Sequence, residues 1–159
     1  MSGCGSEPEA RAPERGASSS KPVTFLYGTP RGEEFGSATT RGRATAILFV
    51  TTYDFPSQIM ARRLDAVVRR HRPRANAGAV VLEQPDHAPF AEVFRSTLDL
   101  GYPVAMTTTF DVQGSGPFGI IDKIPTLVVL DREGREVARL FGNVDEEAIE
   151  EALSSAESR

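Results

Sequence analysis

Apolar residues along the chain form short uninterrupted runs, separated by longer segments in which they recur every three or four positions. The runs Thr45–Thr52 and Ala77–Gln84 show no alternation with polar residues, as is typical of strands buried on both faces of a sheet. The segment between them predicts an amphipathic helix, which Pro73 ends. The positions on its apolar stripe are Ile59, Met60, Leu64, Val67, Val68 and His71.

Similar patterns predict the elements on either side of this strand–helix–strand unit. A second helix is expected at Ala88–Leu98, where it presents Phe90, Val93, Phe94 and Leu98. A loop rich in glycine follows at Gln113–Gly119. The further strands expected from short apolar runs between turn signals are Val23–Tyr27, Phe35–Thr40, one near Val104, and the hairpin of Pro125–Asp131 with Arg135–Phe141.

A final helix follows the hairpin. Asn143 is predicted to cap it, and Glu146 three residues later completes a capping box. Strands that alternate with helices require parallel crossovers, whereas the hairpin adds antiparallel strands. The predicted fold class is therefore α/β, a mixed β-sheet flanked by helices with a short strand extension at the N-terminal side.

The first 22 residues differ in composition from the rest. They hold almost no large apolar side chain and are rich in Gly, Ser, Pro, Glu and Arg, so they cannot bury enough surface to offset the entropy of ordering. We expect a flexible, disordered tether at residues 1–22 and a folded domain at residues 23–156. Cys4, among small residues and ahead of a polar linker, is similar to the lipidated cysteine of bacterial lipoproteins, although no charged or apolar leader precedes it. A lipid anchor on Cys4 and an inert thiol on a tether both remain open.

Composition narrows the function classes. The 159 residues, 40% hydrophobic and 25% charged, suit one globular domain, and no apolar run approaches the roughly 18 residues that span a bilayer. A net charge of −4 argues against nucleic acid as the main partner. Cys4 is the only cysteine, so no intrachain disulfide can form. The two histidines lack close ligand spacing, and we expect neither a metal nor another cofactor.

The order of elements and several motifs resemble the thioredoxin fold, and within it the TlpA/ResA-like (redoxin) branch of envelope thiol-disulfide proteins. The segment ILFVTTYDFPSQ resembles the strand-to-helix turn where that family carries an aromatic residue and a C-x-P-C motif. GYPVAM and GPFGIIDKIPTLVVLDREGREVARLFG are similar to its mid-chain strand and to its loop, proline and hairpin. The resemblance covers roughly Val23 to Ala156 and implies a thioredoxin-like domain. It also implies a periplasmic or cell-envelope location, with a cytoplasmic one as the alternative.

The resemblance assigns the family's motif residue by residue. Tyr53 stands at the aromatic position, and Pro125, preceded by Ile124, matches the proline that is cis in this fold and faces the active site. Both sulfurs of the family are missing from this chain. The positions that match the family's C-x-P-C motif are, in order, Asp54, Phe55, Pro56 and Ser57.

Asp54 and Ser57 cannot replace a dithiol, because exchange requires a thiolate that attacks and a second thiol that resolves the mixed disulfide. Asp54 instead suits the start of a helix, where its carboxylate can accept a hydrogen bond from the Ser57 N–H. Ser57 has no identifiable base, so a catalytic triad is not supported. We interpret His71 as a helix-terminal residue and His87 as a loop residue. The arginines of the first long helix and the turn after it are interpreted as a solvated face: Arg62, Arg63, Arg69, Arg70, Arg72 and Arg74.

The leading hypothesis is a redox-inactive thioredoxin-fold protein that serves as a binding or accessory module of the bacterial cell envelope. Its partner would be a protein or extended peptide that pairs beside the proline as a strand pairs with a sheet edge. The alternative is a thiol-disulfide oxidoreductase or peroxidase of the TlpA/redoxin type that acts through Cys4 or a partner's thiol. The expected binding surface is Tyr53, Asp54, Phe55, Ile124, Pro125 and Thr126.

Overall fold

The computed structural model describes residues 21–159, apart from the side chains of Thr109 and Phe110. Cys4 and most of the predicted tether lie outside the described residues. At the start of the described part, Val23 N–H donates to the Gly134 carbonyl at 2.8 Å. Pro22 forms an isolated bridge with Arg135. The chain therefore joins the sheet at about the residue where the composition changes.

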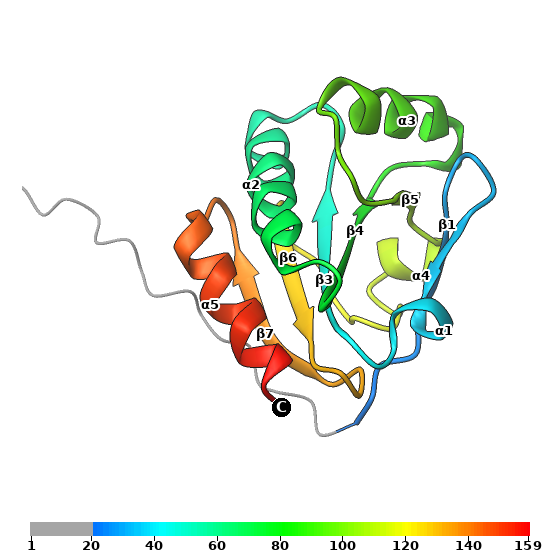
Figure 1. Cartoon of the computed structure of the whole chain (residues 1–159). Helices are drawn as coiled ribbons and strands as arrows, with labels where there is room; N and C mark the ends of the chain where they lie inside the picture. Colours follow the sequence, from blue (N-terminus) through cyan, green and yellow to red (C-terminus); the bar gives the residue numbers. More distant parts are fainter. Residues whose placement is uncertain (1–20) are drawn as a thin grey trace, which may run out of the picture.

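The centre of the molecule is one mixed sheet of seven strands in the order β2-β1-β5-β4-β3-β6-β7 (Figure 1). The central strands β3, β4 and β5 run parallel, and the remaining neighbours pair antiparallel. The predicted α/β class with a mixed sheet is confirmed. The strands are β1 (Leu26–Gly28), β2 (Glu34–Gly36), β3 (Ala44–Val50), β4 (Ala75–Val81), β5 (Val104–Met106), β6 (Thr126–Leu130) and β7 (Glu136–Phe141).

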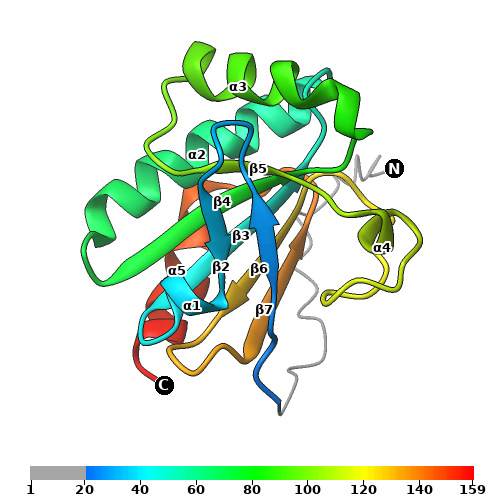
Figure 2. The same ribbon diagram turned by 90° about the vertical axis from the view of Figure 1, so that its right-hand side faces the viewer.

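Helices cover both faces of this sheet, as the two views in Figure 1 and Figure 2 show. The helices α2 (Phe55–His71), α3 (Ala88–Thr97) and α5 (Glu146–Glu157) contribute to one apolar cluster. The short helices α1 (Ser37–Thr40) and α4 (Thr109–Val112) lie toward the opposite face. A single 3₁₀ turn, η1 (Pro85–His87), leads into α3. Within residues 21–159, no helix combines the length and the apolar character needed to cross a bilayer.

Strand β3 divides its side chains between the two clusters, and all seven of its residues are buried. Alternate residues such as Leu48 face α2 and α5, whereas Phe49 faces an aromatic group. In that group, the ring of Phe118 lies 5.5 Å from the ring of Phe49 and 5.4 Å from that of Phe25. The continuous apolar run in the sequence therefore reflects a strand covered on both faces, as predicted.

Two local predictions differ from the structure, and one short helix was not predicted. Phe35–Thr40 was expected to be a strand, but β2 ends at Gly36 and the helix α1 begins at Ser37, because hydroxyl groups bond the backbone there: Thr40 Oγ1 donates to the Gly36 carbonyl at 3.0 Å. The N-cap of α5 is Asp145 rather than Asn143, and its carboxylate accepts from Ala148 N–H at 2.9 Å. Helix α4 was not predicted.

Candidate functional site

The predicted site residues meet at one end of the strands, where the chain leaves β3 and enters β6. Strands β3 and β6 are antiparallel, with Phe49 opposite Thr126. The chain leaving β3 and the chain entering β6 therefore lie at the same end of these two strands. The peptide bond between Ile124 and Pro125 is cis. The Pro125 carbonyl accepts a hydrogen bond from Gly142 N–H at 2.8 Å, which fixes this entry to the end of β7. The register thus places Pro125 beside the turn that holds Asp54.

Asp54 caps α2, as the sequence predicted. Its Oδ1 accepts from Ser57 N–H at 2.6 Å, and its Oδ2 accepts from the Thr51 hydroxyl at 2.6 Å. Both carboxylate oxygens are thereby engaged within the turn. The negative charge lies at the N-terminal end of a 17-residue helix, where free N–H groups and the helix dipole favour an anion.

Ser57 is fully buried, with 0% of its side chain surface exposed. Its hydroxyl oxygen accepts a hydrogen bond from Thr51 N–H at 3.2 Å. A hydroxyl in this position cannot reach a substrate in solution, so Ser57 serves to close the turn between β3 and α2. The pair that matches the family's two thiols is therefore held in a structural network.

Replacing Asp54 by alanine is expected to lower the free energy of unfolding by about 1–2 kcal/mol, because the Ser57 N–H loses its acceptor. Asp54→Asn provides the matched control, since an amide oxygen caps almost as well as a carboxylate and should retain most of the stability. Urea unfolding followed by circular dichroism measures both. Equal losses in the two variants would contradict the role of Asp54 as a cap.

The expected binding surface is only partly exposed. Tyr53 and Phe55 project into solvent, with 76% and 70% of their surfaces exposed. Ile124 is half-buried against the aromatic group under the loop. Pro125 and Thr126 differ from the expectation, because both are buried. The Thr126 hydroxyl donates to the Lys123 carbonyl at 2.6 Å. The strand β6 already begins at this residue, so its side chain is part of the fold and not of the surface.

The loop that ends in Pro125 is held by a buried tyrosine. The Tyr27 hydroxyl donates to Asp111 Oδ1 at 2.8 Å, and burial, with the hydrogen bond to Asp111, raises the pKa of Tyr27 far above its usual value. Tyr27 therefore stays protonated and remains a donor. Arg139 Nη2 also donates to the Phe118 carbonyl at 2.9 Å. These contacts fix the loop over the sheet face opposite α2.

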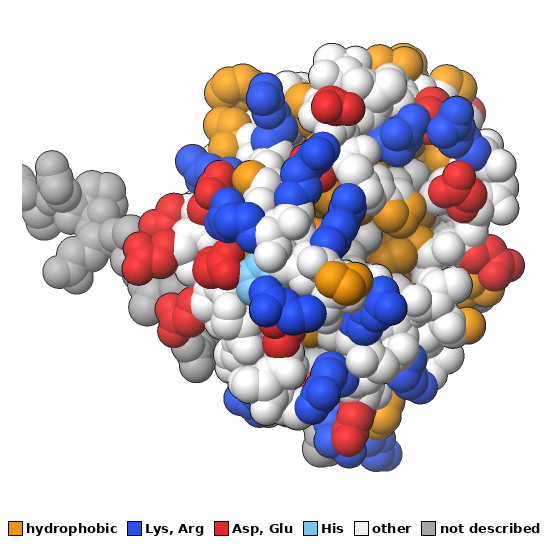
Figure 3. Space-filling model, in the orientation of Figure 1, with side chains coloured by type: hydrophobic (Ala, Val, Ile, Leu, Met, Phe, Trp, Pro, Cys, Tyr) orange, Lys and Arg blue, Asp and Glu red, His pale blue; other side chains and the backbone are white. Residues whose placement is uncertain are grey.

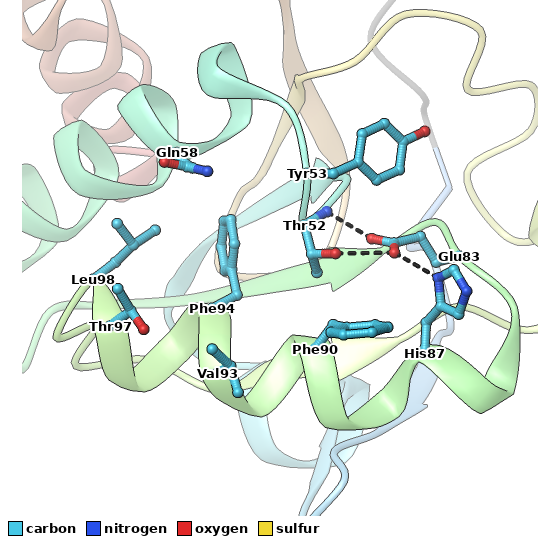
Figure 4. Close-up of a pocket in the computed structure, with 10 residues that line it drawn as sticks. All are labelled: Thr52, Tyr53, Gln58, Glu83, His87, Phe90, Val93, Phe94, Thr97 and Leu98. Atoms are coloured by element: carbon cyan, nitrogen blue, oxygen red, sulfur yellow. Dashed lines mark hydrogen bonds and ion pairs between the residues drawn. The ribbon is translucent and has the colours of Figure 1, made fainter.

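A carboxylate that the sequence analysis did not single out stands beside Tyr53. Glu83 lies two residues beyond the end of β4, and its two oxygens accept from Thr52 N–H at 2.6 Å and from the Thr52 hydroxyl at 2.9 Å. His87 Nδ1 lies 2.8 Å from Glu83 Oε1 (Figure 4). The one signal in the sequence was an acidic residue near the carboxyl end of an apolar run, a position where open α/β sheets commonly bind ligands.

A groove with a volume of about 340 Å³ opens between the start of α2 and α3 (Figure 4). Phe90 and Val93, expected on the packing stripe of their helix, are 55% and 58% exposed and instead wall this groove. The reason is that α3 lies at the margin of the core, so that only Ala91 and Phe94 of this helix are buried. The apolar walls are Tyr53, Phe90, Val93, Phe94 and Leu98.

The arginines of α2 form a basic band across the face shown in Figure 3. Most of them bond groups of the same domain: Arg69 Nε lies 2.7 Å from Asp65, and Arg63 donates to the Val144 carbonyl at 2.8 Å. This fits the interpretation as a solvated face. His71, at the end of the same helix, is not solvated, because it is buried between Glu150 and Glu157 of α5. Within residues 21–159, no group of three His, Cys, Asp or Glu side chains is arranged to hold a metal ion.

Comparison with known proteins supports the fold at low sequence identity. No protein-family model and no curated protein sequence matches the chain. Among solved structures, a thiol:disulfide interchange protein of the thioredoxin family from Chlorobium tepidum TLS is 25% identical, with a TM-score of 0.68 over 86% of this chain and 94% of its own.

Two further structures have higher TM-scores. A secreted thiol-disulfide isomerase from Corynebacterium glutamicum has a TM-score of 0.79 at 13% identity over 96% of both chains. A DsbF homologue from Corynebacterium diphtheriae has a TM-score of 0.75 at 14% identity, over 94% of this chain and 96% of its own. The chain thus has the thioredoxin-like fold, in the form found in thiol:disulfide interchange proteins.

Proposed function

We propose that this chain is a redox-inactive thioredoxin-fold protein that binds other proteins or extended peptides. The observation that carries the proposal is the network at the start of α2. Asp54 and Ser57 stand where a thiol pair would exchange electrons, and both side chains are hydrogen-bonded within the turn. Neither side chain can undergo thiol–disulfide exchange.

The surface around this network remains suited to binding. Tyr53 and Phe55 are large exposed aromatic side chains on adjacent parts of one turn, and Pro125 lies at the same end of the strands. Exposed aromatic residues of this kind are typical anchors in protein–protein interfaces. A peptide that pairs with the backbone beside Pro125 would lie across both rings.

We propose the bacterial cell envelope as the location, with Cys4 as the candidate attachment point for a lipid. Similar structures include proteins described as secreted, from Mycobacterium tuberculosis and Corynebacterium glutamicum, which supports a location outside the cytoplasm. Mass analysis of the protein isolated from its own cells tests this, and an unmodified Cys4 would contradict it.

Reduction of insulin by dithiothreitol tests the absence of redox activity. We expect the chain and its Cys4→Ser variant to leave the rate at the level of dithiothreitol alone, because one thiol cannot resolve a mixed disulfide. Turnover by the chain that disappears in Cys4→Ser would overturn the proposal in favour of a thiol-disulfide oxidoreductase or peroxidase acting through Cys4.

Affinity capture from an envelope extract tests the binding function. Phe55→Ala is expected to reduce the amount of captured partner at least tenfold, since a buried aromatic anchor contributes about 2 kcal/mol or more. Leu26→Ala is the matched control, because Leu26 is also a large exposed apolar side chain but lies on β1. Equal capture by both variants would contradict the assignment of this surface.

A further inference from the structure

The groove between α2 and α3 has apolar walls that the core leaves largely exposed. Phe90 and Val93 project from α3 toward the opening, and Tyr53 stands on the other side (Figure 4). All three side chains are more than half exposed. Such residues lower their free energy when an apolar group covers them, at roughly 25 cal/mol for each Å² removed from water.

The polar end of the groove carries negative charge. The Glu83 carboxylate, with only 5% of its side chain exposed, is fixed there by Thr52 and His87. Asp54 and Asp86 lie in the adjacent turns. None of the residues that line the groove is a lysine or an arginine. Apolar walls of low polarisability strengthen the field of such carboxylates toward a cation at the opening.

The groove is also continuous with the surface assigned to binding. Tyr53 belongs to both, and Gln58, one turn into α2, lines the groove beyond it. A peptide lying across Tyr53 and Phe55 can therefore place a side chain into the groove while it stays on the surface beside Pro125.

From these observations we infer that the groove receives one bulky apolar side chain of a partner peptide, directly next to a lysine or arginine in that peptide. The apolar side chain packs between Tyr53, Phe90 and Val93, and the neighbouring cation lies over the end that holds Glu83. This inference rests on the proposed function, because the peptide is the same one that lies across Phe55. It adds to that function the sequence that the partner must present.

Fluorescence anisotropy with a labelled peptide, Gly-Ser-Lys-Phe-Lys-Ser-Gly, tests the inference. We expect binding that weakens at least tenfold when the phenylalanine is replaced by serine, and at least tenfold when both lysines are replaced by glutamate. Affinity for the original peptide should also fall as salt is raised, because the charges are close to the surface. Failure of the original peptide to bind, or equal binding of all three peptides, would overturn the inference.

Two variants locate the binding. Val93→Lys replaces an exposed apolar wall by a cation and is expected to weaken binding of the original peptide at least tenfold. Val112→Lys makes the same change at an equally exposed position on α4 and is expected to stay within twofold of the unmodified chain. Circular dichroism checks that both variants fold. Equal affinities of the two variants would show that the peptide binds elsewhere.

The same variants separate this inference from the proposed function. If Val93→Lys retains the captured envelope partner while Phe55→Ala loses it, the groove is not the receptor, although the binding surface at Phe55 stands. If both variants retain the partner, the proposed function fails as well.

Discussion

Replacing both Asp54 and Ser57 by cysteine, in a Cys4→Ser background, is expected to give the chain a thiol-disulfide reductase activity that it otherwise lacks. The two positions are three residues apart at the first turn of α2, a spacing that allows a disulfide to form and break. A thiolate at position 54 would lie where the helix N-terminus now stabilises the Asp54 carboxylate, which lowers a thiol pKa. The second sulfur, at the fully buried position 57, would resolve the mixed disulfide.

The expected result is insulin reduction at least tenfold faster than that of dithiothreitol alone. Each single variant, Asp54→Cys or Ser57→Cys, is the matched control and should give no turnover, because it lacks either the attacking or the resolving thiol. The double variant also loses the cap, so its stability should fall by about 1–2 kcal/mol, as for Asp54→Ala. The opposite outcome is a folded double variant that forms the disulfide yet fails to reduce insulin. That result would show that the two missing cysteines are not the only difference between this chain and thioredoxin-fold proteins that exchange disulfides.

The central strand and helix could be predicted because their signals are local. Every residue of β3 is apolar or β-branched, and a strand covered on both faces requires such a run. Asp54 could be identified as the N-cap of α2 because its hydrogen-bond partner, the Ser57 N–H, lies only three residues away. At α1, where a strand was predicted, a non-local contact contributes to the turn. Ser37 Oγ there accepts from Phe25 N–H, twelve residues away, a contact that no local pattern indicates.

The groove could not be predicted because it depends on where α3 lies. Phe90 and Val93 fall on the apolar stripe of α3, and a stripe does not reveal which of its members the core covers. The Glu83 carboxylate bonds Thr52, a residue 31 positions away, and this pairing follows from the parallel register of β3 and β4. The sequence predicted both strands, but their register was set only by the packing of the whole sheet.

The environment of His71 is the other feature that no local sequence pattern indicates. His71 was expected to be a helix-terminal residue, and it does end α2, but only 3% of its side chain is exposed. Its Nε2 contacts the Glu150 carboxylate, and its Nδ1 contacts the Glu157 carboxylate, both on α5. Both ring nitrogens are thus engaged by carboxylates of α5. Both glutamates lie about 80 residues from His71 in the sequence, so no local pattern indicates this cluster.

Replacing His71 by alanine is therefore expected to lower the free energy of unfolding by about 3 kcal/mol, the largest effect on stability that we predict. The change removes the ring that both carboxylates contact, and it leaves a cavity between α2 and α5. Urea unfolding at neutral pH measures the loss. Arg70→Ala is the control in the same seam, because its ion pairs with Glu146 and Glu150 are exposed and contribute less than about 1 kcal/mol. Combining His71→Ala with Glu157→Gln should recover part of the loss, since it removes one of the two like charges. A loss below about 1 kcal/mol in His71→Ala would contradict the role of this cluster.

The pH dependence of stability provides a second measure of the same contact. Burial acts to raise the pKa of Glu150, but hydrogen bonds from His71 and Arg70 lower it by more, so the pKa lies below its ordinary value of 4.5. A carboxylate whose pKa is lowered on folding stabilises the protein fully above the pKa of the unfolded chain. That contribution disappears as the pH falls through the folded pKa. His71→Ala removes a contact that lowers the pKa of Glu150, so the variant has less of this contribution to lose. The difference in unfolding free energy between the chain and the variant should therefore narrow between neutral pH and about pH 3.5, and a constant difference over this range would contradict the assignment.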